Sequence, residues 1–180
     1  MIAKARAAAD CLKGGVVGTV MTNLAMELAL QERGIDFVRA KVGDRYVLEQ
    51  LYAHDWELGG EASGHIVCLD KHNTGDGIIS ALQVFASLQV LNQDLAAALA
   101  DWRPFPQTMI NVRIKKGQDW QSVATPVASV VEKELGQQGR VVLRPSGTEP
   151  VVRVMVEAKH ADVAKAAAEK IARAIDAQVA

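Results

Sequence analysis

Two closely spaced prolines, Pro104 and Pro106, constrain the fold of this chain more than any other feature. They rule out a continuous helix across this point and predict a linker between two separately folded parts. A chain of 180 residues is long enough for two small domains, and 49% hydrophobic residues can supply a core for each. We therefore expect one domain at residues 1–103 and a second at residues 104–180.

The first segment alternates strand-like and helix-like patterns, which is typical of a layered α/β domain. We expect Asn23 or Thr22 to cap its second helix and Asp76 to begin its last one. Met1 leads directly into a helix, which we expect of a piece cut from a larger chain. The expected strands are residues 16–20 and 35–42 and two short strands within 57–69, and the expected helices are residues 2–12, 23–34, 46–53 and 76–100.

The second segment has a different order of patterns, β-α-β-β-α, which predicts a small α+β domain with an antiparallel sheet. Its strands are expected at residues 108–114, 139–143 and 151–156. We expect a helix at 122–135 with an interruption near Pro126. The last helix, 162–177, is expected to be capped and to present Val163, Ala167, Ile171 and Ile175 on one apolar face.

Residues 144–150, with the sequence RPSGTEP, join the two last strands in a tight loop that suits a phosphate group. Arg144 precedes the loop and Arg153 follows it, and a guanidinium can hold two phosphate oxygens at once. Ser146 and Thr148 offer hydroxyl donors, and Gly147 lets the backbone turn its N–H groups inward. The alternative interpretation is an ordinary hairpin turn with two arginines placed by chance.

The overall composition excludes several classes of function. A net charge of -1 argues against a nucleic-acid-binding protein, which would show a basic excess. Four histidines lack the spacing of metal ligands, and no run of residues is long enough to span a membrane. The N-terminus has no signal-peptide pattern, and Cys11 and Cys68 are expected to be buried free thiols. We expect a cytoplasmic protein.

Three motifs also resemble those of the α-D-phosphohexomutases, in the same order along the chain. Residues 144–153 resemble the phosphate-binding loop of the family's last domain, and residues 60–65 (GEASGH) resemble the sugar-binding loop of its third domain. Residues 42–47 (VGDRYV) are most similar to the phosphoglucosamine mutase branch. The resemblance extends from about Gly14 to the C-terminus and implies domains three and four of such an enzyme.

The resemblance also implies roles for individual residues. Glu61 would accept hydrogen bonds from the sugar's O3 and O4 hydroxyls, whereas His65 would donate to the ligand or orient Glu61. Arg45 would contact the ligand, or would be a surface arginine paired with Asp44 or Glu49. The implied substrate-binding residues are Glu61, Ser63, His65 and Arg45, and the implied phosphate-binding residues are Arg144, Ser146, Gly147, Thr148 and Arg153.

The activity implied by the resemblance is the interconversion of glucosamine 6-phosphate and glucosamine 1-phosphate through a 1,6-bisphosphate intermediate, for amino-sugar nucleotide and cell-wall precursor synthesis. Family members carry a phosphoserine loop and a Mg²⁺-binding loop in their first two domains, and neither sequence occurs here. We therefore expect no catalytic or metal-binding residue in this chain, no turnover by the chain alone, and the N-terminal domains as its partner, with a homodimer also open. The alternatives are a fragment of a phosphomannomutase or phosphoglucomutase, a non-catalytic phosphosugar-binding module, or a self-associating structural protein.

Overall fold

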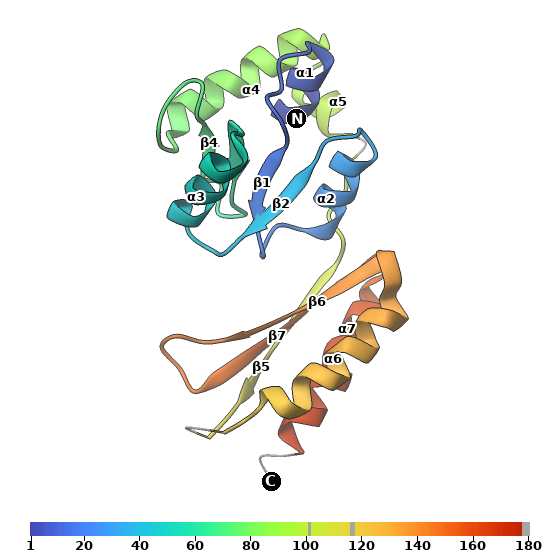
Figure 1. Cartoon of the computed structure of the whole chain (residues 1–180). Coiled ribbons are helices and arrows are strands. Elements are labelled where there is room, and N and C mark those ends of the chain that lie inside the picture. The colour runs from blue at the N-terminus through green and yellow to red at the C-terminus, as the bar shows by residue number, and fades with distance from the viewer. Residues whose placement is uncertain (101, 116–117, 178–180) are drawn as a thin grey trace. The chain divides into compact units, whose positions relative to one another are not determined.

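The computed structural model describes residues 1–100, 102–115 and 118–177 (Figure 1). The chain divides into two units, Met1–Pro104 and Phe105–Ala180, each with its own core. The dividing point lies within the segment in which the sequence predicted a linker. Unit 1 is a mixed α/β domain and unit 2 is a small domain with an antiparallel sheet, so the predicted fold classes are confirmed.

Unit 1 is built on a four-stranded sheet in the order β2-β1-β3-β4. Strand β1 runs parallel to both β2 and β3, and β4 returns antiparallel to β3. The short β3–β4 hairpin therefore lies at one edge of the sheet, with a turn between its strands. The bounds are Val16–Thr19 for β1, Phe37–Ala40 for β2, Leu58–Gly60 for β3 and Ile66–Cys68 for β4.

Helices cover both faces of this sheet. Successive residues of a strand point to opposite sides, so neighbouring residues of β1 pack against different helices. Val16 belongs to the core that includes Ile2 of α1 and Leu30 of α2. The next residue, Val17, belongs to the core that includes Leu51 of α3. The helices are Ile2–Ala8 for α1, Leu24–Gln31 for α2, Asp44–His54 for α3, Gly77–Leu91 for α4 and Leu95–Leu99 for α5.

The single long helix expected at residues 76–100 is two helices. Asn92 ends α4 in the left-handed conformation, with a φ of 48°, and Asp94 caps α5 by accepting a hydrogen bond from the Ala97 N–H (2.8 Å). Asparagine tolerates left-handed backbone and aspartate is a preferred N-cap, which explains the break. The predicted start is confirmed, because the Asp76 carboxylate accepts from the N–H groups of Ile78 and Ile79 (2.8 and 2.9 Å).

Unit 2 follows the predicted β-α-β-β-α order and forms a three-stranded antiparallel sheet, β5-β7-β6. The central strand is therefore β7, which pairs with both of the others. Its strands are Gln107–Arg113 for β5, Gly139–Pro145 for β6 and Val151–Ala158 for β7. Its helices are Gln121–Leu135 for α6, the short 3₁₀ turn Gly136–Gln138, and Ala161–Asp176 for α7.

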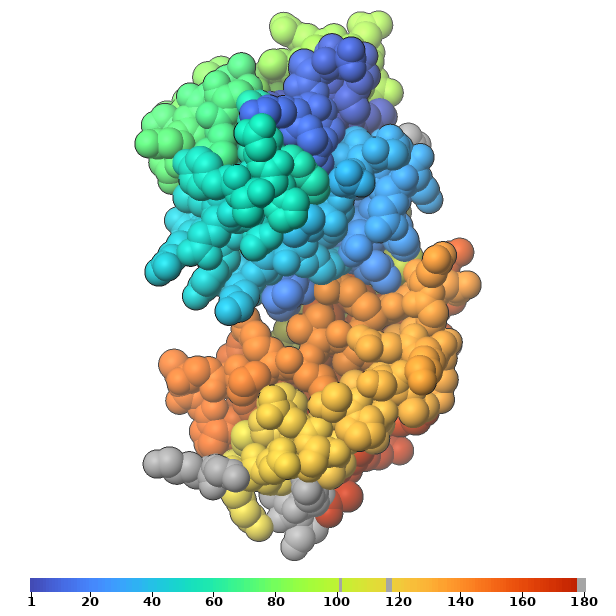
Figure 2. Space-filling view, in the orientation of Figure 1, coloured from blue at the N-terminus to red at the C-terminus, as the bar shows by residue number. Residues whose placement is uncertain are grey.

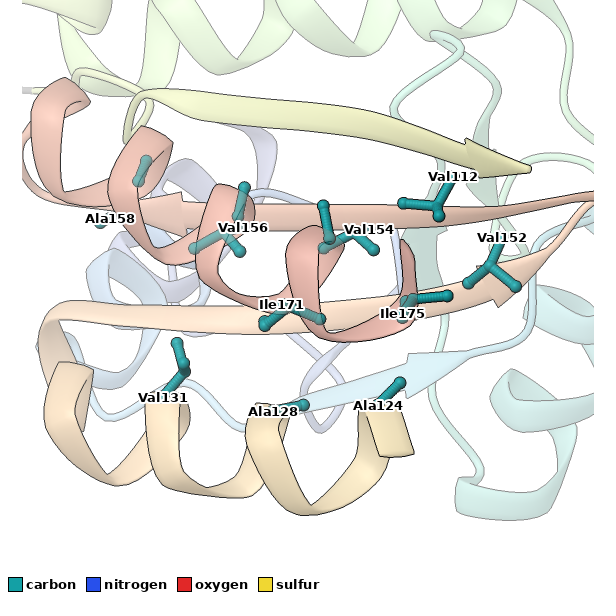
Figure 3. Packing of buried hydrophobic residues seen from close by; sticks show 13 residues of the cluster. Val112, Ala124, Ala128, Val131, Val152, Val154, Val156, Ala158, Ile171 and Ile175 are labelled. Carbon is teal, nitrogen blue, oxygen red and sulfur yellow. The ribbon is translucent and has the colours of Figure 1, made fainter. Parts of the chain in front are cut away.

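Both long helices of unit 2 pack on the same face of this sheet (Figure 3). Val152, Val154 and Val156 of β7 point into this core and are fully buried, together with Ile171 and Ile175 of α7. Fully burying a side chain of this size stabilises the fold by roughly 1.5–3 kcal/mol. The alternate residues of β7, including Arg153, point to the opposite face of the sheet.

Three details of these helices differ from the expectation. The expected cap of α7 is absent, because the side chain of His160 at its N-cap position accepts no hydrogen bond from the helix. Helix α6 is continuous through Pro126, because the carbonyl that the proline leaves without a partner belongs to Ser122, an exposed residue that water can reach. In α7, Val163 is 41% exposed. Residues spaced four apart do not stay on one face of a helix that has 3.6 residues per turn. The residues that α7 buries are Ala164, Ala168, Ile171, Ala172 and Ile175.

The two cysteines are both free, but only one is buried. Cys68 lies in the core of unit 1, where burial raises the pKa of its thiol. Cys11 is exposed, contrary to expectation, because α1 ends at Ala8 and leaves it in the following loop. Across the described residues, none of the helices has the length and apolar character needed to cross a membrane.

The difference between Val163 and Ile171 leads to a prediction about stability. Truncation of Ile171 to alanine should lower the free energy of unfolding of unit 2 by about 2–5 kcal/mol, because it leaves a cavity in a close-packed core. Val163→Ala should change it by less than about 0.5 kcal/mol. Urea denaturation followed through the amide NMR signals of β5, β6 and β7 measures both values. Similar losses for the two variants would contradict the assigned helix face.

Candidate functional site

The loop between β6 and β7 folds around a serine hydroxyl. The Ser146 N–H donates to the carbonyl of Val151 (2.9 Å), which closes the base of the loop. The Ser146 Oγ accepts hydrogen bonds from the N–H groups of Thr148 (3.4 Å) and Glu149 (3.3 Å). Two backbone donors therefore point toward the same oxygen, and at these distances both bonds are weak. An anionic oxygen could replace the hydroxyl as their acceptor.

The two arginines that flank this loop lie directly opposite each other in the sheet. Arg144 of β6 is in register with Arg153 of β7, and both project from the face opposite the helices. Like charges in directly opposed positions repel each other. Within the described ranges, no carboxylate pairs with either arginine, and the Nε of Arg153 is buried without a hydrogen-bond partner. This arrangement would be stabilised by a bound anion.

The structure shows no special backbone role for Gly147. Its φ is not positive, and an added Cβ would meet no atom within 4 Å. Gly147, Thr148 and Glu149 are all exposed. What the glycine provides in this conformation is open space next to the backbone donors of the loop.

The sugar loop, residues 60–65, forms the turn of the β3–β4 hairpin. The Glu61 N–H donates to the carbonyl of His65 (2.8 Å), and Gly64 has a φ of 92°, which strongly favours glycine. The segment from Glu61 to Ser63 is therefore part of a turn between the two short strands. Ser63 is exposed at the tip, whereas Glu61 and His65 are partly buried at the base.

Glu61 joins this turn to the loop that precedes α3. Its Oε1 accepts a hydrogen bond from the N–H of Gly43 at 2.7 Å. Gly43 has a φ of 127°, which a side chain would strain. The carboxylate therefore holds residues 43–45 next to the sugar loop, although Glu61 lies 18 positions further along the chain.

His65 packs against the backbone at Gly75. A Cβ added at Gly75 would lie 2.3 Å from Cε1 and 2.4 Å from Nε2 of the imidazole, so only glycine leaves room for the ring in this position. The Nε2 is buried, and no group in the described parts of the chain forms a hydrogen bond with it. A buried polar atom without a partner is costly, so a ligand or water that reached it would be favoured.

Arg45 is exposed and pairs with Glu49 one helical turn further along α3, at 2.9 Å between Nε and Oε1. This hydrogen bond raises the pKa of the Arg45 guanidinium above its usual value. The pairing corresponds to one of the two interpretations of the sequence. Exposed pairs of this kind contribute little to stability, so an anionic ligand could displace Glu49 at little cost.

A cavity in unit 1 is not a suitable phosphosugar site. It has a volume of about 760 Å³ and is lined mainly by apolar side chains, among them Ile2, Leu30 and Leu58. Glu61 and Gly64 belong to its lining, but the polar groups described above do not converge within it. Among the residues that the structure describes, no three acidic, histidine or cysteine side chains are grouped to hold a metal ion.

Comparison with known proteins identifies both units. Residues 1–105 match the model of the phosphoglucomutase/phosphomannomutase alpha/beta/alpha domain III, and residues 109–174 match the model of the C-terminal domain of the same family. The chain belongs to the phosphoglucomutase/phosphomannomutase family. The resemblance inferred from the three sequence motifs is thereby confirmed.

Relatives within this family are considerably longer than the chain. It is 71% identical over 175 residues to the phosphoglucosamine mutase of Neisseria subflava and 65% identical over 176 residues to that of Chromobacterium violaceum. These matches cover 97% and 98% of the chain but only 39% of each relative. A solved structure of Aspergillus fumigatus N-acetylphosphoglucosamine mutase, in complex with GlcNAc-6P and magnesium, shares the fold with a TM-score of 0.71 at 21% identity, covering 97% of this chain and 44% of that one.

The contacts of Glu61 and His65 were not predicted from the sequence. The pairing of Glu61 with Gly43 and the packing of His65 on Gly75 each join residues from separate loops. The sequence contained only a weak indication of these two contacts: the partner residues, Gly43 and Gly75, are glycines that lie near predicted helix starts. Glycine is common in loops, so this indication does not identify a partner.

The Glu61–Gly43 hydrogen bond leads to a second prediction. Glu61→Ala should speed hydrogen exchange at the Gly43 amide about tenfold or more, because a hydrogen bond to a charged group is worth roughly 1.5–3 kcal/mol. Glu61→Gln is the matched control, since its amide oxygen can still accept the bond. Amide exchange followed by NMR measures the effect. Unchanged exchange in the alanine variant would show that the bond does not hold this loop.

Proposed function

We propose that this chain is the sugar- and phosphate-binding half of a phosphoglucosamine mutase, an enzyme that interconverts glucosamine 6-phosphate and glucosamine 1-phosphate. The names of the relatives that are 65–71% identical support the substrate. The observation that carries the proposal is the opposed pair Arg144 and Arg153, which has no acidic partner in the described parts of unit 2. The adjacent loop directs two backbone donors to one point.

Each loop would have one task in this reaction. The phosphate loop would bind whichever phosphate is not reacting, through Arg144, Arg153 and the backbone around Ser146 and Thr148. The sugar loop would read hydroxyl groups through Glu61, Ser63 and His65, and Arg45 would leave Glu49 to contact the ligand. Fixing both ends of the substrate lowers the barrier by holding the reacting atoms close to the geometry of attack.

The mutase reaction proceeds through a 1,6-bisphosphate, which must turn around between its two phosphoryl transfers. Binding groups that serve both orientations must therefore recognise features common to both. A guanidinium pair recognises any phosphate, and a carboxylate recognises any pair of neighbouring hydroxyls. The contacts of Arg144, Arg153 and Glu61 fit this requirement.

We place the phosphoryl-transfer chemistry outside this chain. The described residues provide no group of ligands suitable for Mg²⁺, and the sequence has neither the phosphoserine loop nor the metal-binding loop of the family. Magnesium and the nucleophilic serine would belong to N-terminal domains of the same cytoplasmic enzyme, which would be the chain's partner. A homodimer of the assembled enzyme is part of this proposal.

The absence of these groups predicts an inactive but binding-competent chain. The purified chain should show no conversion of glucosamine 6-phosphate when glucose 1,6-bisphosphate and Mg²⁺ are supplied. A coupled assay for glucosamine 1-phosphate measures this. Sustained turnover that remains proportional to chain concentration through purification would contradict the assignment of the chemistry to other domains.

Binding is tested by a titration of the isotope-labelled chain with glucosamine 6-phosphate, followed by two-dimensional amide NMR. Shifts should cluster at residues 146–149 and 61–65. Arg144→Ala should weaken binding by about an order of magnitude or more, because hydrogen bonds to charged groups contribute roughly 1.5–3 kcal/mol. Arg173→Ala, which removes the same charge from a surface pair in the same unit, should leave it unchanged.

The same titration separates the competing functions. Mannose 6-phosphate or glucose 6-phosphate bound more tightly than glucosamine 6-phosphate would favour a phosphomannomutase or phosphoglucomutase. A reading frame without the phosphoserine and metal loops upstream of a binding-competent chain would favour a non-catalytic phosphosugar module. An absence of shifts at millimolar ligand would overturn the proposed role of this chain in binding.

A further inference from the structure

The phosphate loop has a third arginine beside it that the sequence motif does not include. Arg113 is the last residue of β5 and lies in register with Val151, the first residue of β7 after the loop. The Ile114 N–H donates to the carbonyl of Pro150 (2.9 Å), which fixes the end of β5 against the end of the loop. Arg113 is therefore held next to the loop, although it lies more than 30 positions before it in the sequence.

Strand alternation places Arg113 on the same face as the other two arginines. Ile110 and Val112 of β5 and the following residue Ile114 pack on the helical core, so Arg113 and Asn111 point to the opposite face. Arg153 lies between Asn111 on β5 and Arg144 on β6. Relative to Arg153, Arg144 is directly opposite and Arg113 is on the diagonal, about 7–8 Å away, a distance that long side chains span.

The charges on this face are not balanced. Unit 2 contains five arginines, and two of them form ion pairs: Arg140 with Glu157, at the other end of the same sheet face, and Arg173 with Glu169 on α7. For Arg113, Arg144 and Arg153, no carboxylate partner exists among the residues that the structure describes. Three neighbouring guanidiniums without a counter-charge raise the local potential and attract an anion of more than one charge.

We infer that Arg113 is a third guanidinium of the phosphate-binding site and that the site selects a phosphate group in its doubly charged form. This inference rests on the proposed function, because the phosphate loop must bind phosphate for Arg113 to assist it. The second ionisation of a phosphate monoester has a pKa of about 6, so the dianion is the main form near neutral pH. A third positive charge favours that form over a monoanion such as a sulfate ester.

The experiment is the NMR titration of the 180-residue chain with glucosamine 6-phosphate and with glucosamine 6-sulfate, a monoanion of similar shape. Arg113→Ala should weaken binding of the phosphate about three- to tenfold, as expected for loss of one partly screened contact to a charged group. It should weaken binding of the sulfate less. Arg113→Lys should recover part of the loss, since it restores the charge without the planar fork of donors.

Arg144→Ala and Arg173→Ala are the controls that give each outcome a meaning. If Arg144→Ala weakens binding and Arg113→Ala binds like the unaltered chain, the proposed function stands and the role of Arg113 is wrong. An equal loss for the phosphate and the sulfate in Arg113→Ala would overturn selection of the dianion. No binding by the unaltered chain would overturn the proposed function and this inference together. An Arg113→Ala amide spectrum unchanged away from β5 and the loop verifies the fold.

Discussion

The pairing of β6 with β7 is the interaction on which the candidate phosphate site depends. Its register places Arg144 opposite Arg153, and a shift of one strand by one residue would turn the arginine of that strand toward the helical core. Such a shift would bury a charge, and a shifted β7 would also expose its valines, at a high cost in free energy. The packing of Val152, Val154 and Val156 against α7 therefore holds the arginines in place, and core stability and ligand recognition in unit 2 have the same origin.

The strongly patterned parts of the fold could be predicted from the sequence. Alternating valines predicted β7, because a strand that buries one face has an apolar residue at every second position. The order of the patterns predicted β-α-β-β-α. Helix ends were less predictable. Asn92 and Asp94 are two polar residues within a long apolar run, and only their backbone angles and capping bonds show that one helix ends and another begins there. At Pro126 the sequence predicted an interruption that does not occur, because an exposed proline near a helix start destabilises the helix less than one at its centre.

The residues of the candidate site were easier to predict than their contacts. The arginines and the loop between them are close in sequence, so motif reasoning could place them together. The bond between Glu61 and Gly43 and the packing of His65 on Gly75 depend on how separate loops approach each other. The position of Arg113 depends on sheet order, because β5 neighbours β7 and not β6. Nothing in the local pattern of β5 determines which strand it pairs with.

The hydrogen bond between Glu61 and Gly43 makes the two oxygens of one carboxylate unequal. Oε1 already holds a backbone amide of the protein, whereas Oε2 has no hydrogen-bond partner within the described structure. A hydroxyl that approaches Oε2 gains a bond without disturbing the loop before α3. A hydroxyl that approaches Oε1 shares an acceptor with the Gly43 N–H, which weakens the bond that holds the first residues of that helix. The side from which a sugar meets this carboxylate thus decides how firmly the loop before α3 is held.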